Sequence, residues 1–187
     1  MNEISMPTEP QFGDADQECR YPVRFDGHFL GRIFRWHGAW YAVAAGQSDE
    51  VRVAAGSTGS EAAARHLVDE YTAGRIAPQQ ETESGPTAPD GLFGPVPLLH
   101  PRMPVTPRNT DAAHVAMAGL TAYLWTPKTG YPGADNPWFV ICGLCSWEGP
   151  RYWSHLRGRN GNPPSAFRHP KCIDPAKVRA RIPAYQK

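Results

Sequence analysis

The stretch Cys142-Gly143-Leu144-Cys145 is followed, after 23 intervening residues, by His169-Pro170-Lys171-Cys172. Two thiols two residues apart, then an imidazole and a thiol with the same spacing, form a four-ligand set of the kind that a structural zinc ion takes. Three of the four cysteines of the chain lie in this stretch. The spacing therefore predicts a small module stabilised by Zn²⁺ that is bound to Cys142, Cys145, His169 and Cys172.

Other interpretations of these residues remain open at this point. His155 is a second candidate for the histidine ligand. The cysteine pair is also compatible with an incidental arrangement or with a redox dithiol, but a redox dithiol needs a βα unit after its first cysteine, and residues 146–150 have no helical pattern. A loop of about 30 residues cannot bury enough apolar surface to fold alone. A bound metal contributes on the order of 10 kcal/mol, which favours the zinc interpretation.

Aromatic residues accompany the ligands, and they have two explanations. They form either a miniature core around the metal or a surface on which nucleic-acid bases stack. The core is the favoured explanation for these four residues, which are Trp147, Tyr152, Trp153 and Phe167.

The first 75 residues divide into a tail and a compact module. Residues 1–20 are polar, acidic and aperiodic, which predicts a disordered tail. Residues 21–75 contain three strand-like stretches and then a helical pattern that starts at a capping box of Thr58 and Glu61 and stops at Gly74. The pattern predicts a three-stranded antiparallel sheet with one helix across it, with strands at 28–36, 39–45 and 50–55.

The remaining residues form a linker and a second module. Residues 76–110 are rich in proline and predict an extended linker. Residues 111–187 contain a helix over 111–124, a short strand over 138–141, the metal module and a basic tail. The expected fold class is α+β: a small three-stranded antiparallel sheet with one helix, a Pro-rich linker and a C-terminal zinc-finger module.

Charge is distributed unevenly along the chain. Residues 1–137 carry 10 Lys+Arg against 16 Asp+Glu, whereas residues 138–187 carry 9 against 2. A basic end that is rich in aromatic residues is typical of nucleic-acid binding. Arginine pairs bidentately with phosphate and with guanine edges. The predicted nucleic-acid-binding residues are Arg151, Arg157, Arg159, Arg168, Lys171, Arg179 and Arg181, flanked by Lys177 and Lys187.

The pattern C-x2-C-x-W-x-G…W-S-H-L-R-G…H-x2-C, from Cys142 to Cys172, resembles the zinc-finger modules of small actinobacterial phage and mobile-element proteins. It is also loosely similar to other Cys-Cys-His-Cys fingers. The resemblance covers residues 142–172 alone and implies DNA binding of an accessory or regulatory kind. The spacing of Cys2His2 fingers is missing, so their three-base readout cannot be carried over.

The module of residues 21–75 offers a second surface. Three-stranded sheets backed by a helix can enter the DNA major groove, as in the arm-type domains of integrases, and Arg32, Arg35 and Arg52 are candidates for such a face. The same module carries many acidic residues. A unit that binds a protein partner or dimerises is therefore the favoured interpretation of residues 21–75.

An enzymatic interpretation is also possible. A His-Asn-His type nuclease would use His155, Asn160, Asn162 and His169 around a second metal, but the usual adjacent His-His or Asp-His pair is missing. A non-enzymatic protein is favoured. The chain has no apolar run of about 20 residues, and Met1 to Gln17 lacks an apolar signal region. We therefore expect a cytoplasmic, zinc-stabilised nucleic-acid-binding protein, with a protein–protein adaptor as the first alternative and a nuclease as the second.

Overall fold

The computed structural model of the chain describes residues 9–81 and 95–186. The chain forms two compact units, residues 1–91 and residues 92–187, and each is described by itself. Part of the predicted tail (1–8), part of the predicted linker (82–94) and Lys187 lie outside the described residues.

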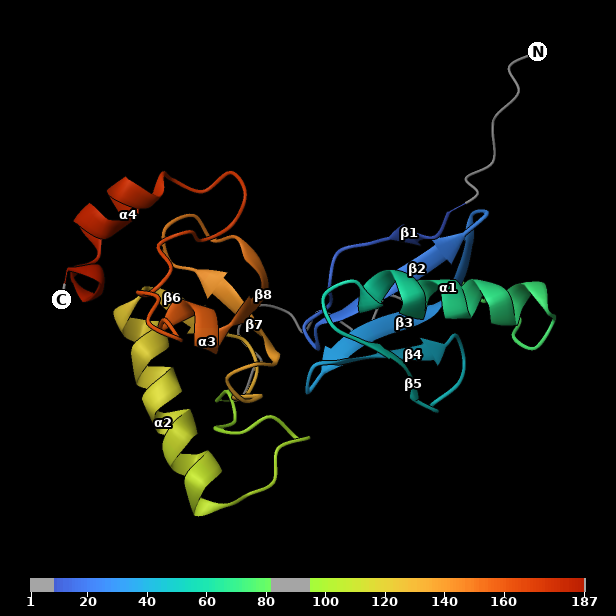
Figure 1. Cartoon of the computed structure of the whole chain (residues 1–187), viewed down its shortest axis with the longest axis horizontal. Helices are drawn as coiled ribbons and strands as arrows, with labels where there is room; N and C mark the ends of the chain where they lie inside the picture. Colours follow the sequence, from blue (N-terminus) through green and yellow to red (C-terminus); the bar gives the residue numbers. More distant parts are fainter. Residues whose placement is uncertain (1–8, 82–94, 187) are drawn as a thin grey trace, which may run out of the picture. The chain divides into compact units, whose positions relative to one another are not determined.

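Unit 1 is a five-stranded antiparallel sheet with one helix on one face (Figure 1). The strands follow one another in space in chain order, and helix α1 (Gly59–Thr72) packs against β3, β4 and β5. A tight turn at His37 and Gly38, both at positive φ (48° and 75°), joins β3 to β4, as the sequence predicted. The strands are β1 (Gln11–Phe12), β2 (Arg20–Phe25), β3 (His28–Trp36), β4 (Ala39–Ala44) and β5 (Val51–Ala55).

The expected fold class was wrong in its count of elements. The described residues contain two antiparallel sheets, of five and three strands, and four α-helices, instead of one three-stranded sheet with one helix. The sequence pattern missed β2 because Pro22 interrupts it, and proline normally argues against a strand between two others. The structure tolerates Pro22 because β1 pairs with β2 only at Val23 and Arg24, and beside this pairing Pro22 serves as an acceptor: its carbonyl receives a hydrogen bond from the Gly13 amide at 3.1 Å.

The core of unit 1 depends on an irregularity in β3. Leu30 and Ile33 are both fully buried against α1, although residues three apart in a regular strand point to opposite faces. The register between β2 and β3 shifts between Val23 and Arg24, and Gly31 has a φ of 146°. The bulge therefore turns both side chains towards the helix, where they meet Ala63, Ala64 and Leu67.

The ends of α1 agree with the sequence at one end only. The helix ends before Gly74, which has a φ of 70° and lets the chain turn away, as predicted. At the other end the Thr58 side chain makes no capping hydrogen bond, so the predicted capping box is absent.

Unit 2 contains a three-stranded antiparallel sheet and three helices (Figure 1). Strand β7 lies in the middle, between β6 and β8. Helix α2 begins earlier than predicted because Thr106 caps it, by accepting a hydrogen bond from the Asn109 amide (3.2 Å), with Pro107 at its first position. The elements are α2 (Pro107–Ala122), β6 (Trp125–Pro127), β7 (Pro137–Cys142), β8 (Glu148–Tyr152), α3 (Trp153–Leu156), α4 (Pro175–Arg181) and a 3₁₀ turn, η1 (Pro183–Tyr185).

Two separate apolar clusters stabilise unit 2. The larger one lies between α2 and the sheet, and it includes Trp138, Val140 and Cys142, which alternate along one face of β7. Gly119 of α2 allows the Trp153 ring to lie against the helix backbone, because a Cβ at residue 119 would come within 2.1 Å of that ring. The second cluster contains just three buried residues, Ala166, Val178 and Ile182, and joins α4 to the segment before it.

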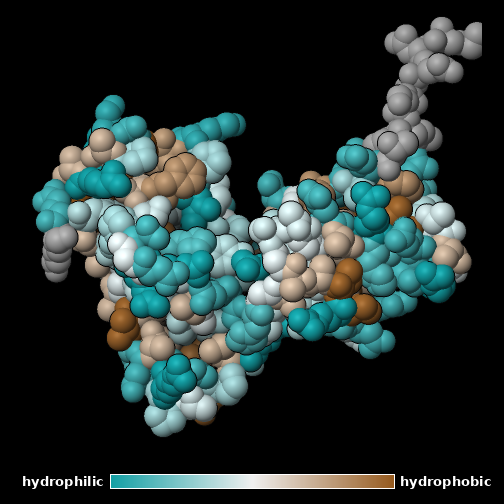
Figure 2. Space-filling model, viewed as in Figure 1, coloured by the Kyte–Doolittle hydropathy of each residue, from teal (hydrophilic) through white to brown (hydrophobic). Residues whose placement is uncertain are grey.

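The face of the molecule that Figure 2 shows is mainly polar. In Figure 2 hydrophilic side chains dominate the visible face of each unit, and apolar side chains occur in small separate groups. Among the residues that the structure describes, no helix is long and apolar enough to cross a membrane.

Candidate metal centre

The first two ligands lie at the tip of the β7–β8 hairpin. Cys142 is the last residue of β7, and its amide donates to the carbonyl of Trp147 (2.8 Å), which closes the loop. Within the loop, the amides of Cys145 (3.3 Å) and Ser146 (2.8 Å) donate to the Cys142 carbonyl. Ser146 has a φ of 59°, which lets the chain reverse into β8. This tight turn brings the two thiols to the same side.

Gly143 has a different role from the one that its place in a tight turn predicts. It is absent from the residues at positive φ. Instead its amide donates to the Leu124 carbonyl at 2.9 Å, and a Cβ at residue 143 would lie only 2.9 Å from that oxygen. Glycine is therefore needed here because the turn packs closely against the end of α2.

The other two ligands lie on a second turn, before α4. The Cys172 amide donates to the His169 carbonyl (3.2 Å), with Pro170 and Lys171 between them. Lys171 has a φ of 67°. Proline followed by a residue at positive φ defines a type II turn, and this turn places the imidazole and the thiol side by side.

The two turns bring the four predicted ligands together. The ligand atoms of Cys142, Cys145, His169 and Cys172 all lie within 4.8 Å of one another, which is close enough for all four to hold one metal ion. The Sγ atoms of Cys142 and Cys172 are 4.0 Å apart, near the separation of about 3.8 Å for two sulfurs on a tetrahedral zinc. Cys145 Sγ and His169 Nε2 are 3.0 Å apart, shorter than the about 3.6 Å that the same geometry gives. The four residues that the sequence predicted as ligands therefore do lie together, close enough to hold one metal ion.

The environment of His169 prepares its Nε2 atom for a metal. Nδ1 lies 2.8 Å from the Pro170 carbonyl, which can only accept a hydrogen bond. Nδ1 therefore carries the proton, and Nε2 offers its lone pair to the cluster. The ring is also held flat against Trp147, with centroids 4.4 Å apart and planes 10° apart. His155, the alternative ligand, is exposed and lies outside the cluster.

Arg168 is part of the centre and not of the surface. Its side chain is 1% exposed, and its Nε donates to Cys142 Sγ at 3.0 Å. Nη1 donates to the Tyr123 carbonyl (2.8 Å) and Nη2 to the Leu124 carbonyl, at the C-terminal end of α2. The guanidinium also stacks on Trp125, 3.9 Å from the ring centroid. The predicted role of Arg168 in nucleic-acid binding is therefore incompatible with its position.

The surroundings of Cys142 and Cys172 shift the pKa values of these two thiols in opposite directions. Burial raises the pKa of the Cys142 thiol, but the hydrogen bonds from Arg168 and the Leu144 amide outweigh burial and lower this pKa to about 6. Burial and the neighbouring Cys142 raise the pKa of Cys172 to about 11. A divalent cation favours the thiolate form of each cysteine ligand, so metal binding would release protons from the thiols.

The four aromatic residues near the ligands do not share one environment. Trp153 is buried in the larger core cluster, Trp147 is half-buried against His169, and Tyr152 is half-buried. Phe167 is 57% exposed. Trp147 and Trp153 belong to the larger apolar cluster together with Cys142 and Cys172, whereas Tyr152 and Phe167 belong to neither cluster of unit 2, so the predicted miniature core describes two of the four residues.

The predicted basic residues differ in how available they are. Arg151 is half-buried, with its guanidinium 4.6 Å from the Trp147 ring centroid, and Arg159 is exposed but forms an ion pair with Asp135 at 2.8 Å. Four others are exposed, namely Arg157, Lys171, Arg179 and Arg181, as is Lys177. Within residues 9–81 and 95–186, none of these five has a salt bridge to a carboxylate.

The candidates for a catalytic metal site are not assembled. Of His155, Asn160, Asn162 and His169, only His169 belongs to the metal cluster, and the other three are exposed.

Unit 1 does not present a single basic face. The cross-strand pairs Phe34–Tyr41 and Tyr41–Arg52 place Arg52 on the helix-free face, whereas Arg35 pairs with Trp40 on the face that α1 covers. Arg32 forms an ion pair with Asp16 at 3.7 Å. The grouping of these three arginines on one face was therefore wrong, because the alternation along β3 separates residues 32 and 35.

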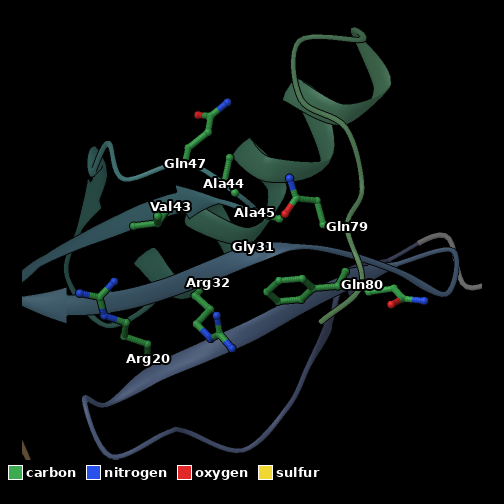
Figure 3. A pocket seen from close by; sticks show the side chains of 11 residues that line it. Arg20, Gly31, Arg32, Val43, Ala44, Ala45, Gln47, Gln79 and Gln80 are labelled. Atoms are coloured by element: carbon green, nitrogen blue, oxygen red, sulfur yellow. The ribbon is translucent and has the colours of Figure 1, made fainter. Parts of the chain in front are cut away.

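One pocket in unit 1 is polar, and its arginines are already paired with carboxylates (Figure 3). It has a volume of about 160 Å³ and lies between β3 and residues 79–80, with Arg20 and Arg32 on its wall. Arg20 contacts Glu18 at 2.9 Å and Glu50 at 3.6 Å. Since acidic partners from the same unit neutralise both guanidinium groups, the pocket has little capacity to attract an anion.

Comparison with protein-family models, with curated proteins and with solved structures finds no match. The resemblance to phage and mobile-element fingers is thus unsupported by these comparisons, and the functional argument depends on the site itself.

Proposed function

We propose that Cys142, Cys145, His169 and Cys172 hold a structural Zn²⁺, and that the unit stabilised by this ion binds nucleic acid, with DNA as the first substrate to test. The observation that carries the proposal is the convergence of three thiols and one imidazole within 4.8 Å, in a unit whose exposed cations include five without a carboxylate partner among residues 9–81 and 95–186.

The ligand set favours zinc and a structural role. Sulfur and imidazole ligands in a tetrahedral arrangement suit Zn²⁺ better than the hard cations, which prefer oxygen. Four protein ligands fill the coordination shell and leave no position for a substrate or a reactive water. This argues for a stabilising ion and against a catalytic one at this cluster. Thiol ligands persist in a reducing compartment, which is consistent with a cytoplasmic location.

Arg168 supports an ion bound by three thiolates. Zn²⁺ with three thiolates and a neutral imidazole carries one negative charge, and a buried guanidinium needs a nearby negative charge. Arg168 makes its Nε hydrogen bond to Cys142 Sγ and otherwise bonds to backbone carbonyls. The metal–thiolate group supplies the charge that this arrangement requires.

Charge supports nucleic acid as the partner of unit 2. Residues 92–187 carry 12 Lys+Arg against 4 Asp+Glu, while residues 1–91 carry 7 against 14. Exposed cations without carboxylate partners exchange condensed counterions for phosphate contacts. Unit 1 lacks this excess, so its role as a protein-binding unit stays a separate proposal.

Two measurements on the full chain test the proposal. Purified protein should contain one zinc per chain, and both Cys142→Ser and His169→Ala should lose it, whereas His155→Ala should retain it as the matched control. Zinc retained in all three variants would overturn the metal assignment. Fluorescence anisotropy with a labelled DNA should show binding that weakens with salt, with a log–log slope of roughly −3 to −4 for four phosphate contacts. No binding at low salt, with zinc present, would leave the adaptor alternative instead.

A further inference from the structure

The segment that carries two of the ligands presents an aromatic ring and a cation to solvent. Arg168 and His169 point into the centre and are 1% and 5% exposed. Phe167, immediately before them, is 57% exposed, and Lys171, between His169 and Cys172, is also exposed. The turn from His169 to Cys172, with the buried Arg168 directly before it, therefore fixes the backbone that presents Phe167 and Lys171 to solvent.

Neither residue is explained by the folding of the segment. The Phe167 ring contributes to neither apolar cluster of unit 2. Lys171 occupies the third position of a type II turn at a φ of 67°, where glycine or asparagine would be less strained. A lysine at such a position is better explained by a use for its charge than by the turn itself.

Helix α4 adds further cations to the same segment. Val178 and Ile182 pack on Ala166, and the Tyr185 hydroxyl donates to the Ser165 carbonyl at 3.0 Å, so α4 is attached directly before Phe167. Its exposed residues include Lys177, Arg179 and Arg181. The one acidic residue between 153 and 186, Asp174, is occupied as the α4 cap, where it accepts a hydrogen bond from the Ala176 amide at 2.8 Å.

The geometry points to a binding site for single-stranded nucleic acid, formed by Phe167, Lys171 and the cations of α4. One unpaired base stacks on the exposed Phe167 ring, while Lys171 and the α4 side chains contact the neighbouring phosphates. Only an unstacked base offers its face to a ring, whereas a duplex hides base faces and offers phosphates alone. This inference rests on the proposed function and specifies its substrate class.

The test compares one sequence in two forms. Zinc-loaded full-length protein is titrated into a labelled 12-nucleotide single strand and into the blunt duplex of the same sequence, at matched salt. We expect tighter binding to the single strand. Phe167→Ala should weaken single-strand binding about tenfold or more, and duplex binding by much less, because base–aromatic stacking is lost. Phe167→Trp should retain it, and Phe12→Ala, which removes an exposed ring of unit 1, is the matched control.

The outcomes separate this inference from the proposed function. If the duplex binds as tightly as the single strand and Phe167→Ala changes neither, the stacking site is wrong while nucleic-acid binding stands. An equal loss on both substrates would also overturn stacking. If neither substrate binds, and vesicles with anionic lipids bind instead, both proposals fail. Zinc content checks the fold of each variant, and Lys171→Gly gives a second probe: the salt slope on the single strand should fall by about 0.7.

Discussion

The two units of this chain solve the same folding problem in different ways. Unit 1 covers one face of a five-stranded sheet with a 14-residue helix and closes one apolar cluster. Unit 2 has a three-stranded sheet, and the segment of residues 165–186 is secured by a cluster of only three buried residues together with the two ligands His169 and Cys172. The difference indicates what a metal at this cluster would contribute, since a segment with so little apolar burial needs another source of stability.

Loss of the proposed metal should have the largest effect, because it should unfold part of unit 2 and leave unit 1 folded. Cys145→Ser, or a zinc chelator, should unfold the region from 142 to 186 and leave unit 1 folded, because metal binding contributes on the order of 10 kcal/mol to a small module. Amide signals recorded by NMR, before and after chelation, would report each unit separately. Simultaneous loss of both sets of signals would show that the two units are not independent in stability.

Replacement of Arg168 should have the next largest effect. Arg168→Met removes a buried hydrogen-bonded cation, and the loss of one partner of such an arrangement costs about 3–5 kcal/mol. Zinc affinity, measured by competition with a chelator of known affinity, should fall by a corresponding factor. Arg159→Met, at an exposed ion pair, is the matched control and should change the affinity little. Equal zinc affinity in the two variants would show that Arg168 does not stabilise the bound metal.

A cavity in the core of unit 1 should show whether the stability of this unit is independent of zinc. Leu67 is 1% exposed, so Leu67→Ala should destabilise unit 1 by about 2–5 kcal/mol. The same loss should be measured in urea with zinc present and with zinc chelated. A loss that depended on zinc would mean that the metal also stabilises unit 1.

The smallest expected effect concerns surface charge. Arg181→Ala on α4 should leave zinc content and unfolding unchanged and reduce the salt slope of DNA binding by about 0.9, the share of one phosphate contact. Arg75→Ala, at an exposed ion pair with Glu70 in unit 1, should leave the slope as it is. Similar slopes for both variants and the unaltered protein would place the binding surface elsewhere.

Spacing alone predicted the ligand set, because each pair of ligands lies on one short turn. The length and sequence of the segment between the two turns do not affect the spacing within either pair. Short runs of strand-forming residues likewise located β3, β4 and most of β7. The strands that the sequence concealed contain residues that normally break strands, such as Pro22 in β2 and the Gly149-Pro150 pair in β8. Their pairing depends on neighbours that are distant in the sequence.

The role of Arg168 could not be predicted from charge. A count of basic residues treats each arginine alike, and only the approach of the α2 carboxyl end and of Cys142 distinguishes this one. Its place directly before His169 was the single available signal. The three arginines of unit 1 failed as a predicted face for a related reason, because orientation along a strand depends on exact residue parity.

The position of Cys142 at the end of β7 has a consequence for strand pairing. Trp138, Val140 and Cys142 point the same way, so the face of β7 that fills the core also carries the first of the four clustered ligands. If β7 slipped by one residue against β8, the Cys142 thiol would turn away from the other three ligands at the same moment as the two apolar side chains left the core. An ion bound to the cluster would therefore fix the register of the hairpin, and the six residues between Ile141 and its partner Glu148 could not change in number without separating the ligands.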